Sequence, residues 1–70
     1  MRYGTLVFDE RRDHYDIRFD LYDYYGGLAE GDTLDVFIGG KWKHTSVAYG
    51  DNWYLKGIRT RELNGLRVRI

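Results

Sequence analysis

The chain has no cysteine and no proline among its 70 residues. The absence of cysteine excludes disulfide bonds and thiolate metal sites. The absence of proline means that no strand loses a backbone donor, which is compatible with continuous sheet pairing. A domain of this length buries only about 60% of its unfolded surface, so its stability requires a dense core. Seven tyrosines, three phenylalanines and two tryptophans provide the apolar area for that core.

Long apolar runs are also missing, and no stretch has the length of a signal-peptide core or of a membrane span. The composition therefore predicts a single domain over residues 1–70, with a cytoplasmic location and no membrane partner.

The formal net charge is zero, but the two halves of the chain differ in sign. Residues 1–35 hold four arginines against nine carboxylates, and residues 36–70 hold seven lysines or arginines against two carboxylates. Opposite charges on neighbouring strands would neutralise one another. The alternative is a basic face formed by the C-terminal strands, which would attract an anionic partner.

The clearest local pattern is an alternation of apolar residues followed by a pair of glycines. Leu34, Val36 and Ile38 share one side of an extended chain, which predicts a strand with one buried face. Gly39 and Gly40 can adopt the positive φ angles of a tight reversal into a second strand. The expected fold class is therefore an antiparallel β meander.

Further strands are expected wherever the alternation recurs between charged or glycine-rich turns. The expected strands are Thr5–Phe8, His14–Phe19, Leu34–Ile38, Lys41–Tyr49, Trp53–Lys56 and Leu66–Ile70. Residues 21–30 are predicted to form a loop or one irregular turn, and residues 59–65 a loop that contains a short helical turn. Five or six antiparallel strands with a helical turn before the last one predict an all-β fold, a small SH3-like barrel. Closure of the barrel would leave no exposed sheet edge.

Several short motifs keep their order along almost the whole chain. They are Gly4-x-Leu6 with Phe8-Asp9, Tyr15-Asp16-Ile17, Leu28-x-x-Gly31-Asp32, Ile38-x-Gly40-Lys41-Trp42, Trp53-Tyr54-Leu55 with Gly57, and Gly65-Leu66-Arg67-Val68-Arg69-Ile70. In these motifs the chain resembles a family of small domains of unknown function from Gram-positive (Firmicutes) genomes, often on mobile elements. The resemblance implies no activity and no functional residues, because that family has none assigned.

A shorter segment is similar to the opening of eukaryotic signalling SH3 domains. The matching residues are Leu21-Tyr22-Asp23-Tyr24 and Gly31-Asp32-x-Leu34-x-Val36, with Trp42 in the place of the groove tryptophan. In that family, paired aromatic residues bind polyproline II peptides. This chain lacks the proline near the final strand, and Tyr54 precedes a differently shaped segment. The similarity therefore indicates shared architecture, which does not establish a function.

No catalytic, cofactor or metal motif is present. His14 and His44 do not have the spacing of a ligand pair, and Asp20 and Asp23 lack the spacing of a calcium loop. The serine and glycine-rich segments match neither a nucleophile elbow nor a phosphate-binding loop. We therefore expect no enzyme activity, no cofactor, no metal and no small-molecule substrate.

Binding is the function class that remains, so the predicted role is a small intracellular interaction module. Tyr22, Tyr24 and Tyr25 lie beside acidic residues, and exposed tyrosines are common anchors of protein interfaces. This cluster is the predicted site for an unknown protein partner, or for a second copy of the chain in a homodimer.

The alternative is nucleic-acid binding, in which rings stack on bases and cations follow phosphates. The predicted nucleic-acid site consists of Lys41, Trp42, Lys43, Trp53, Lys56, Arg67 and Arg69. The competing interpretation places the two tryptophans in the core or at the barrel rim, with the lysines as their outward neighbours.

Overall fold

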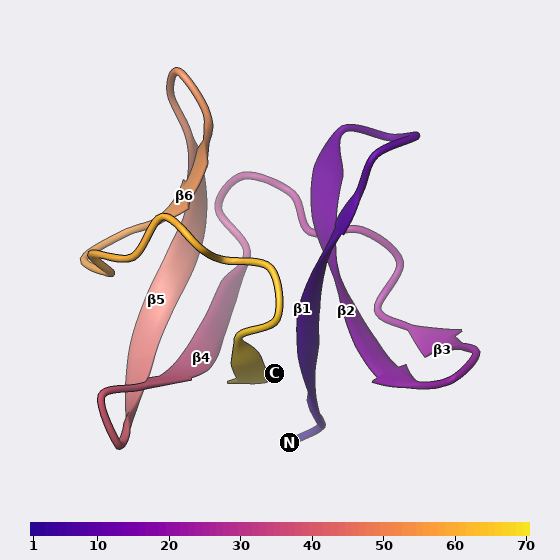
Figure 1. Ribbon diagram of the computed structural model, residues 1–70, viewed down its shortest axis with the longest axis horizontal. Coiled ribbons are helices and arrows are strands. Elements are labelled where there is room, and N and C mark those ends of the chain that lie inside the picture. The colour runs from indigo at the N-terminus through magenta and orange to yellow at the C-terminus, as the bar shows by residue number, and fades with distance from the viewer.

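The computed structural model describes all 70 residues, and its regular elements are β-strands alone. The strands are β1 (Tyr3–Asp9), β2 (His14–Asp20), β3 (Asp23–Tyr24), β4 (Thr33–Ile38), β5 (Lys41–Tyr49), β6 (Trp53–Leu55) and β7 (Arg67–Arg69). They form one antiparallel sheet in the order β3-β2-β1-β7-β4-β5-β6 (Figure 1). The predicted all-β, antiparallel class is confirmed.

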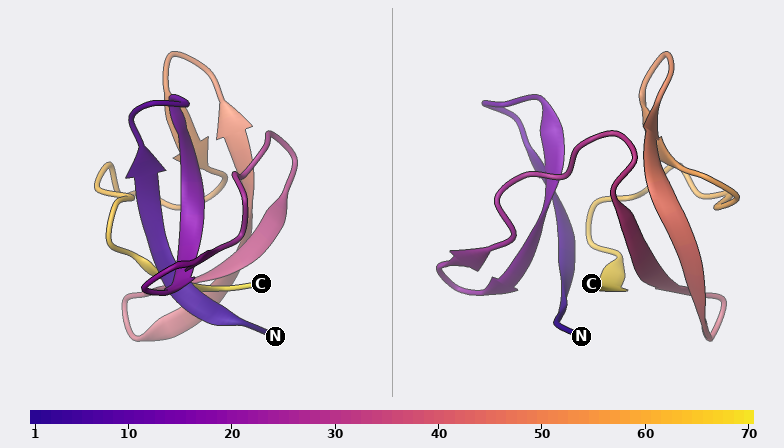
Figure 2. Two further views of the ribbon diagram at one scale, coloured as in Figure 1. Left: turned by 90° about the vertical axis from the view of Figure 1, so that its right-hand side faces the viewer. Right: turned by 180° about the vertical axis from the view of Figure 1, so that it is seen from behind.

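The core lies between two hairpins, β1–β2 and β4–β5, and β7 joins them by pairing with both β1 and β4. In the left view of Figure 2, the β1–β2 hairpin lies in front of the β4–β5 hairpin. The buried core residues are Leu6, Ile17, Leu28, Leu34, Val36, Val47, Leu55, Leu63 and Val68. Both hairpins therefore turn one apolar face inward and leave the other face of the sheet outside.

The turn between β4 and β5 follows the sequence pattern closely. Gly39 and Gly40 have φ angles of 60° and 76°, and the strands pair directly before and after them, Ile38 with Lys41. Two positive φ angles in a two-residue loop are typical of the hairpin turn whose twist matches the flanking strands. The predicted strands on either side of these glycines are confirmed.

The predicted closure of the sheet into a barrel is wrong, because β3 and β6 are free edges. β1 already pairs on both sides, and the far side of β2 is occupied by β3 and by N–H groups from residues 25–28. The three-residue β6 therefore has no strand left to pair with. A single side-chain hydrogen bond joins β6 to the turn between β1 and β2, because Trp53 Nε1 donates to the Asp13 carbonyl at 2.9 Å.

The helical turn predicted within residues 59–65 is also absent. The backbone there is drawn into the sheet, since Gly65 donates to the Leu6 carbonyl and Leu6 donates to the Leu66 carbonyl. Asn64 adds a side-chain acceptor for the Phe8 N–H at 2.8 Å. One local bond remains, from the Leu66 N–H to the Leu63 carbonyl at 3.1 Å, and the pairing with β1 takes the backbone groups that a helical turn would need.

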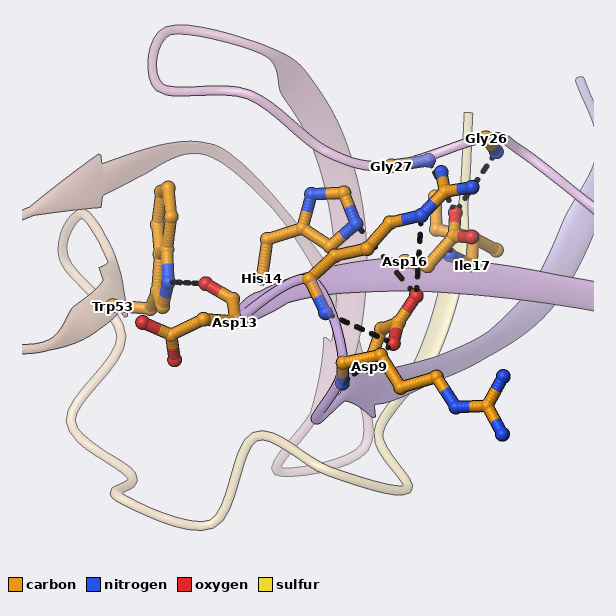
Figure 3. Close-up of polar contacts among 10 residues, drawn as sticks. Asp9, Asp13, His14, Asp16, Ile17, Gly26, Gly27 and Trp53 are labelled. Atoms are coloured by element: carbon orange, nitrogen blue, oxygen red, sulfur yellow. Dashed lines mark hydrogen bonds and ion pairs between the residues drawn. The ribbon is translucent and has the colours of Figure 1, made fainter.

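A buried carboxylate fixes the loop that follows β3. Asp16 is 9% exposed, and its Oδ1 accepts hydrogen bonds from the N–H groups of Gly26 (3.0 Å), Gly27 (2.8 Å) and Ile17 (2.8 Å) (Figure 3). Both glycines have positive φ angles, 111° and 104°. The His14 ring packs against Gly27. One carboxylate and one ring therefore hold this loop, together with the backbone bonds from Tyr25 and Leu28 to β2.

Candidate functional site

One continuous row of side chains crosses the outer face of the sheet. The strand register pairs Tyr24 with Arg18, Arg18 with Thr5, Thr5 with Arg67, and Phe37 with Trp42. The β4–β7 register sets Arg67 beside Phe37, and both line one surface hollow with Trp42. We call these six residues the outer-face row. Six strands about 4.8 Å apart give it a length of about 24 Å.

The outer-face row is open to solvent and contains no carboxylate. Five of its six side chains are exposed, and the sixth, Trp42, is half-buried. Neither Arg18 nor Arg67 takes part in an ion pair; the pairs of the molecule are Arg2–Asp23, Arg12–Asp9, His14–Asp9, His44–Asp35 and Arg69–Asp35. The row therefore carries two unneutralised positive charges between aromatic rings.

Trp42 is the ring that the surrounding side chains hold in place. Tyr3 and Phe37 meet it edge to face, with centroids at 5.7 and 5.1 Å. The Arg69 guanidinium lies over its ring face at 4.3 Å from the centroid. The Arg69 guanidinium covers a face of the Trp42 ring, so we assign Trp42 the role of a support for its two neighbours. These neighbours, Tyr3 and Phe37, are 51% and 40% exposed.

Asp35 lies next to this aromatic group and orients Arg69. Its two carboxylate oxygens bond to His44 Nδ1 at 2.8 Å and to Arg69 Nε at 2.9 Å. These bonds, that of His44 first and that of Arg69 second, hold the pKa of Asp35 below its ordinary value. Asp35 joins the acidic half and the basic half of the chain, through an ion pair to Arg69 and a hydrogen bond to His44.

This arrangement predicts a loss of stability in acid that depends on Asp35. Its folded-state pKa is lowered, so its contribution is complete above the ordinary carboxyl value of about 3.9 and is lost as the pH falls through the folded value. We expect the Asp35→Asn variant to show a flatter decline in the free energy of urea unfolding between neutral and acidic pH. An unchanged acid decline would show that Asp35 contributes nothing to it.

Three of the seven predicted nucleic-acid residues meet on this face, namely Trp42, Arg67 and Arg69. The others are placed elsewhere: Lys41 and Lys43 point to the opposite side of β5, Trp53 packs at the core rim, and Lys56 follows the end of β6.

Of the predicted protein-binding residues, Tyr24 lies in the outer-face row, whereas Tyr22 lies in the turn between β2 and β3 and Tyr25 follows β3. All three tyrosines are exposed, Tyr22 to 95%.

Sequence reasoning missed Tyr3, Arg18 and Phe37. The signal that could have found Phe37 was its outward position in a strand already predicted, because it alternates with the buried Leu34 and Val36 and the partly buried Ile38. An aromatic residue at an outward position of a strand is a candidate for a binding surface. The register that joins these positions depends on β7 lying between β1 and β4, which the sequence does not reveal.

Neither a metal cluster nor a membrane-crossing helix is found. No group of three or more His, Asp or Glu side chains gathers closely enough to hold a metal ion. No helix in the structure has the length and apolar character needed to traverse a bilayer.

Comparison with known proteins gives the family and the fold. A crystal structure of a protein from Ruminococcus gnavus is 46% identical, with a TM-score of 0.93, covering 99% of this chain and 100% of that one. No curated protein matches. The family model described as "Domain of unknown function (DUF5348)" matches residues 4–70. With that match over nearly its whole length, the chain belongs to the DUF5348 family of domains of unknown function.

Proposed function

We propose that this domain binds single-stranded nucleic acid across the outer-face row. The observation that carries the proposal is the position of Arg18 and Arg67, two arginines without acidic partners, between exposed aromatic rings on an open sheet face. Single-stranded nucleic acid offers both ligands that such a surface accepts, because bases stack on rings and phosphates bind cations.

The row divides the binding between its residues. Tyr24 at one end of the row and Phe37 near the other supply rings for bases. Tyr3 lies beside Phe37 and Trp42, and Trp42 holds Phe37 and Tyr3 in position. Arg18 and Arg67 supply the phosphate contacts in the middle. A nucleic acid lying along β3-β2-β1-β7-β4-β5 therefore runs across the strands.

A net charge of zero argues for weak binding, and a surface with two free arginines argues for a modest salt dependence. Two phosphate contacts to a single strand correspond to a slope of about −1.4 in a plot of log K against log salt. The resemblance implies a domain encoded on Gram-positive mobile elements, and the composition predicts a cytoplasmic location. Such a setting would bring the domain near nucleic acid and fits this proposal.

The test is the binding of a fluorescein-labelled twelve-residue oligo-dT, followed by fluorescence anisotropy at low salt and at increasing salt. We expect Arg67→Ala to weaken binding at every salt concentration and to reduce the salt slope by about 0.7. We expect Phe37→Ala to weaken binding by about 1–3 kcal/mol, the contribution of one stacked base.

Two matched variants control for charge and for ring loss outside the row. Arg11→Ala removes an exposed arginine from the β1–β2 turn, and Tyr22→Ala removes an exposed ring. Both should leave oligonucleotide binding unchanged. Absence of an anisotropy change at the lowest salt, or equal losses in row and control variants, would refute the proposal.

Protein binding through the turn between β2 and β3 is the second candidate. Leu21 and Tyr22 are 67% and 95% exposed there, which is an unusual pair of apolar side chains for a tight turn. Asp20 and Asp23 flank them and would repel phosphate. A protein partner or a second copy of the chain is therefore the ligand that suits this turn.

A further inference from the structure

β5 is longer than the strand that covers its outer edge. Its last three residues pair with β6, and the Lys56 N–H continues this pairing to the Ser46 carbonyl. Its first four residues, Lys41 to His44, pair with β4 on one side and with no strand on the other. The sheet therefore has a short free edge beside the β4–β5 turn.

The hydrogen bonds show which backbone groups face that edge. Val47 bonds to the segment that leads into β4, whereas Ser46 bonds to Lys56 on the β6 side. Because this direction alternates along an antiparallel strand, the backbones of Trp42 and His44 also face the β6 side. Their two N–H groups and two carbonyls have no protein partner.

The surroundings of this edge are basic. Lys41 and Lys43 are exposed, share one side of β5 and take part in no ion pair. Lys43 lines a groove of about 400 Å³ together with Ile58 and Arg59, and no carboxylate lines it. A chain entering here meets positive charge on one side and the Trp42 and His44 side chains on the other.

We propose that this edge of β5 binds an acidic, extended segment of a protein partner by β-strand addition. Backbone bonds to Trp42 and His44 supply the pairing, and acidic side chains at alternate positions face Lys41 and Lys43. A second copy of β5 would set like charges opposite one another, which disfavours self-pairing. A nucleic acid cannot supply a strand's alternating donors and acceptors. The proposal shares Trp42 with the outer-face row, but it uses the backbone of Trp42, whereas the row uses its ring.

The probe is a capped seven-residue peptide, acetyl-Ser-Glu-Val-Glu-Val-Glu-Ser-amide, titrated into the ¹⁵N-labelled domain. We expect chemical-shift changes centred on Trp42 and His44, and slower hydrogen exchange of these two amides in the complex. N-methylation of the peptide on its pairing side removes its donors without changing its charge. This change should lower the affinity about tenfold, the effect of losing two neutral hydrogen bonds.

Charge and ligand class are tested with matched pairs. Lys43→Glu should weaken peptide binding several-fold, and Arg11→Glu, the same charge change on the distant β1–β2 turn, should not. Unprotected Trp42 and His44 amides at saturating peptide would overturn the proposal. The proposal would also be overturned if the N-methylated peptide bound as tightly as the unmodified one. It would equally fail if oligo-dT shifted the Trp42 and His44 amides and the peptide did not.

Discussion

Asp16→Ala is expected to lower the free energy of unfolding by about 2–4 kcal/mol. The Asp16 carboxylate is buried, and one of its oxygens accepts N–H groups from Gly26 and Gly27 across the loop. Alanine removes these charge-assisted bonds and leaves donors without partners in a partly buried place. The loss is large for a 70-residue domain, because such domains have only a few kcal/mol of stability in total.

Urea unfolding followed by tryptophan fluorescence measures this loss. Asp16→Asn is the matched variant, because it keeps an acceptor at the same place but makes neutral hydrogen bonds. Its free energy of unfolding should lie between that of the wild type and that of Asp16→Ala. A matched exposed aspartate, Asp51→Ala, should change stability by no more than about 0.5 kcal/mol. Equal stabilities of Asp16→Ala and Asp51→Ala would contradict the role assigned to Asp16.

The β4–β5 hairpin could be predicted from sequence because its information is local. Leu34, Val36 and Ile38 give the period of the strand, and Gly39 and Gly40 give the turn. The Lys41–Tyr49 strand follows directly from them. Buried faces within other strands were predictable for the same reason, as Ile17 shows in β2.

The openness of the sheet could not be predicted, because it depends on which distant edges are already occupied. β7 lies between β1 and β4, and residues 25–28 cover the far side of β2. Both contacts join segments far apart in the chain, and a periodic pattern contains no information about them. The helical turn expected in residues 59–65 failed for the same reason, since Leu6 provides the bonding partners there.

The candidate site shows the same division between local and distant information. Trp42, Arg67 and Arg69 stood out by residue type, and the structure places them on one face. Lys41 and Lys43 stood out equally, yet the strand's alternation places them on the other side of β5 from Trp42. Residue type therefore identified candidates, and register decided which of them form one surface.

Gly27→Ala is expected to be among the most destabilising single substitutions in the chain. A Cβ at this position would lie 2.3 Å from His14 Cε1, and the backbone has a φ of 104°. The φ angle alone costs an L-residue about 1–3 kcal/mol. Displacing the half-buried His14 ring adds a further 1–3 kcal/mol, the usual range for overpacking.

Gly26→Ala separates these two costs, because Gly26 has a similar φ of 111° but no atom within 4 Å of the added Cβ. We expect Gly26→Ala to lose only the conformational part in urea unfolding, and Gly27→Ala to lose more by the cost of moving His14. In a His14→Ala background that excess should disappear, since the double-mutant cycle removes the contact itself. Equal losses for Gly26→Ala and Gly27→Ala would mean that the His14 ring moves aside freely. An excess that persists without the ring would mean that the two glycines differ in backbone strain alone.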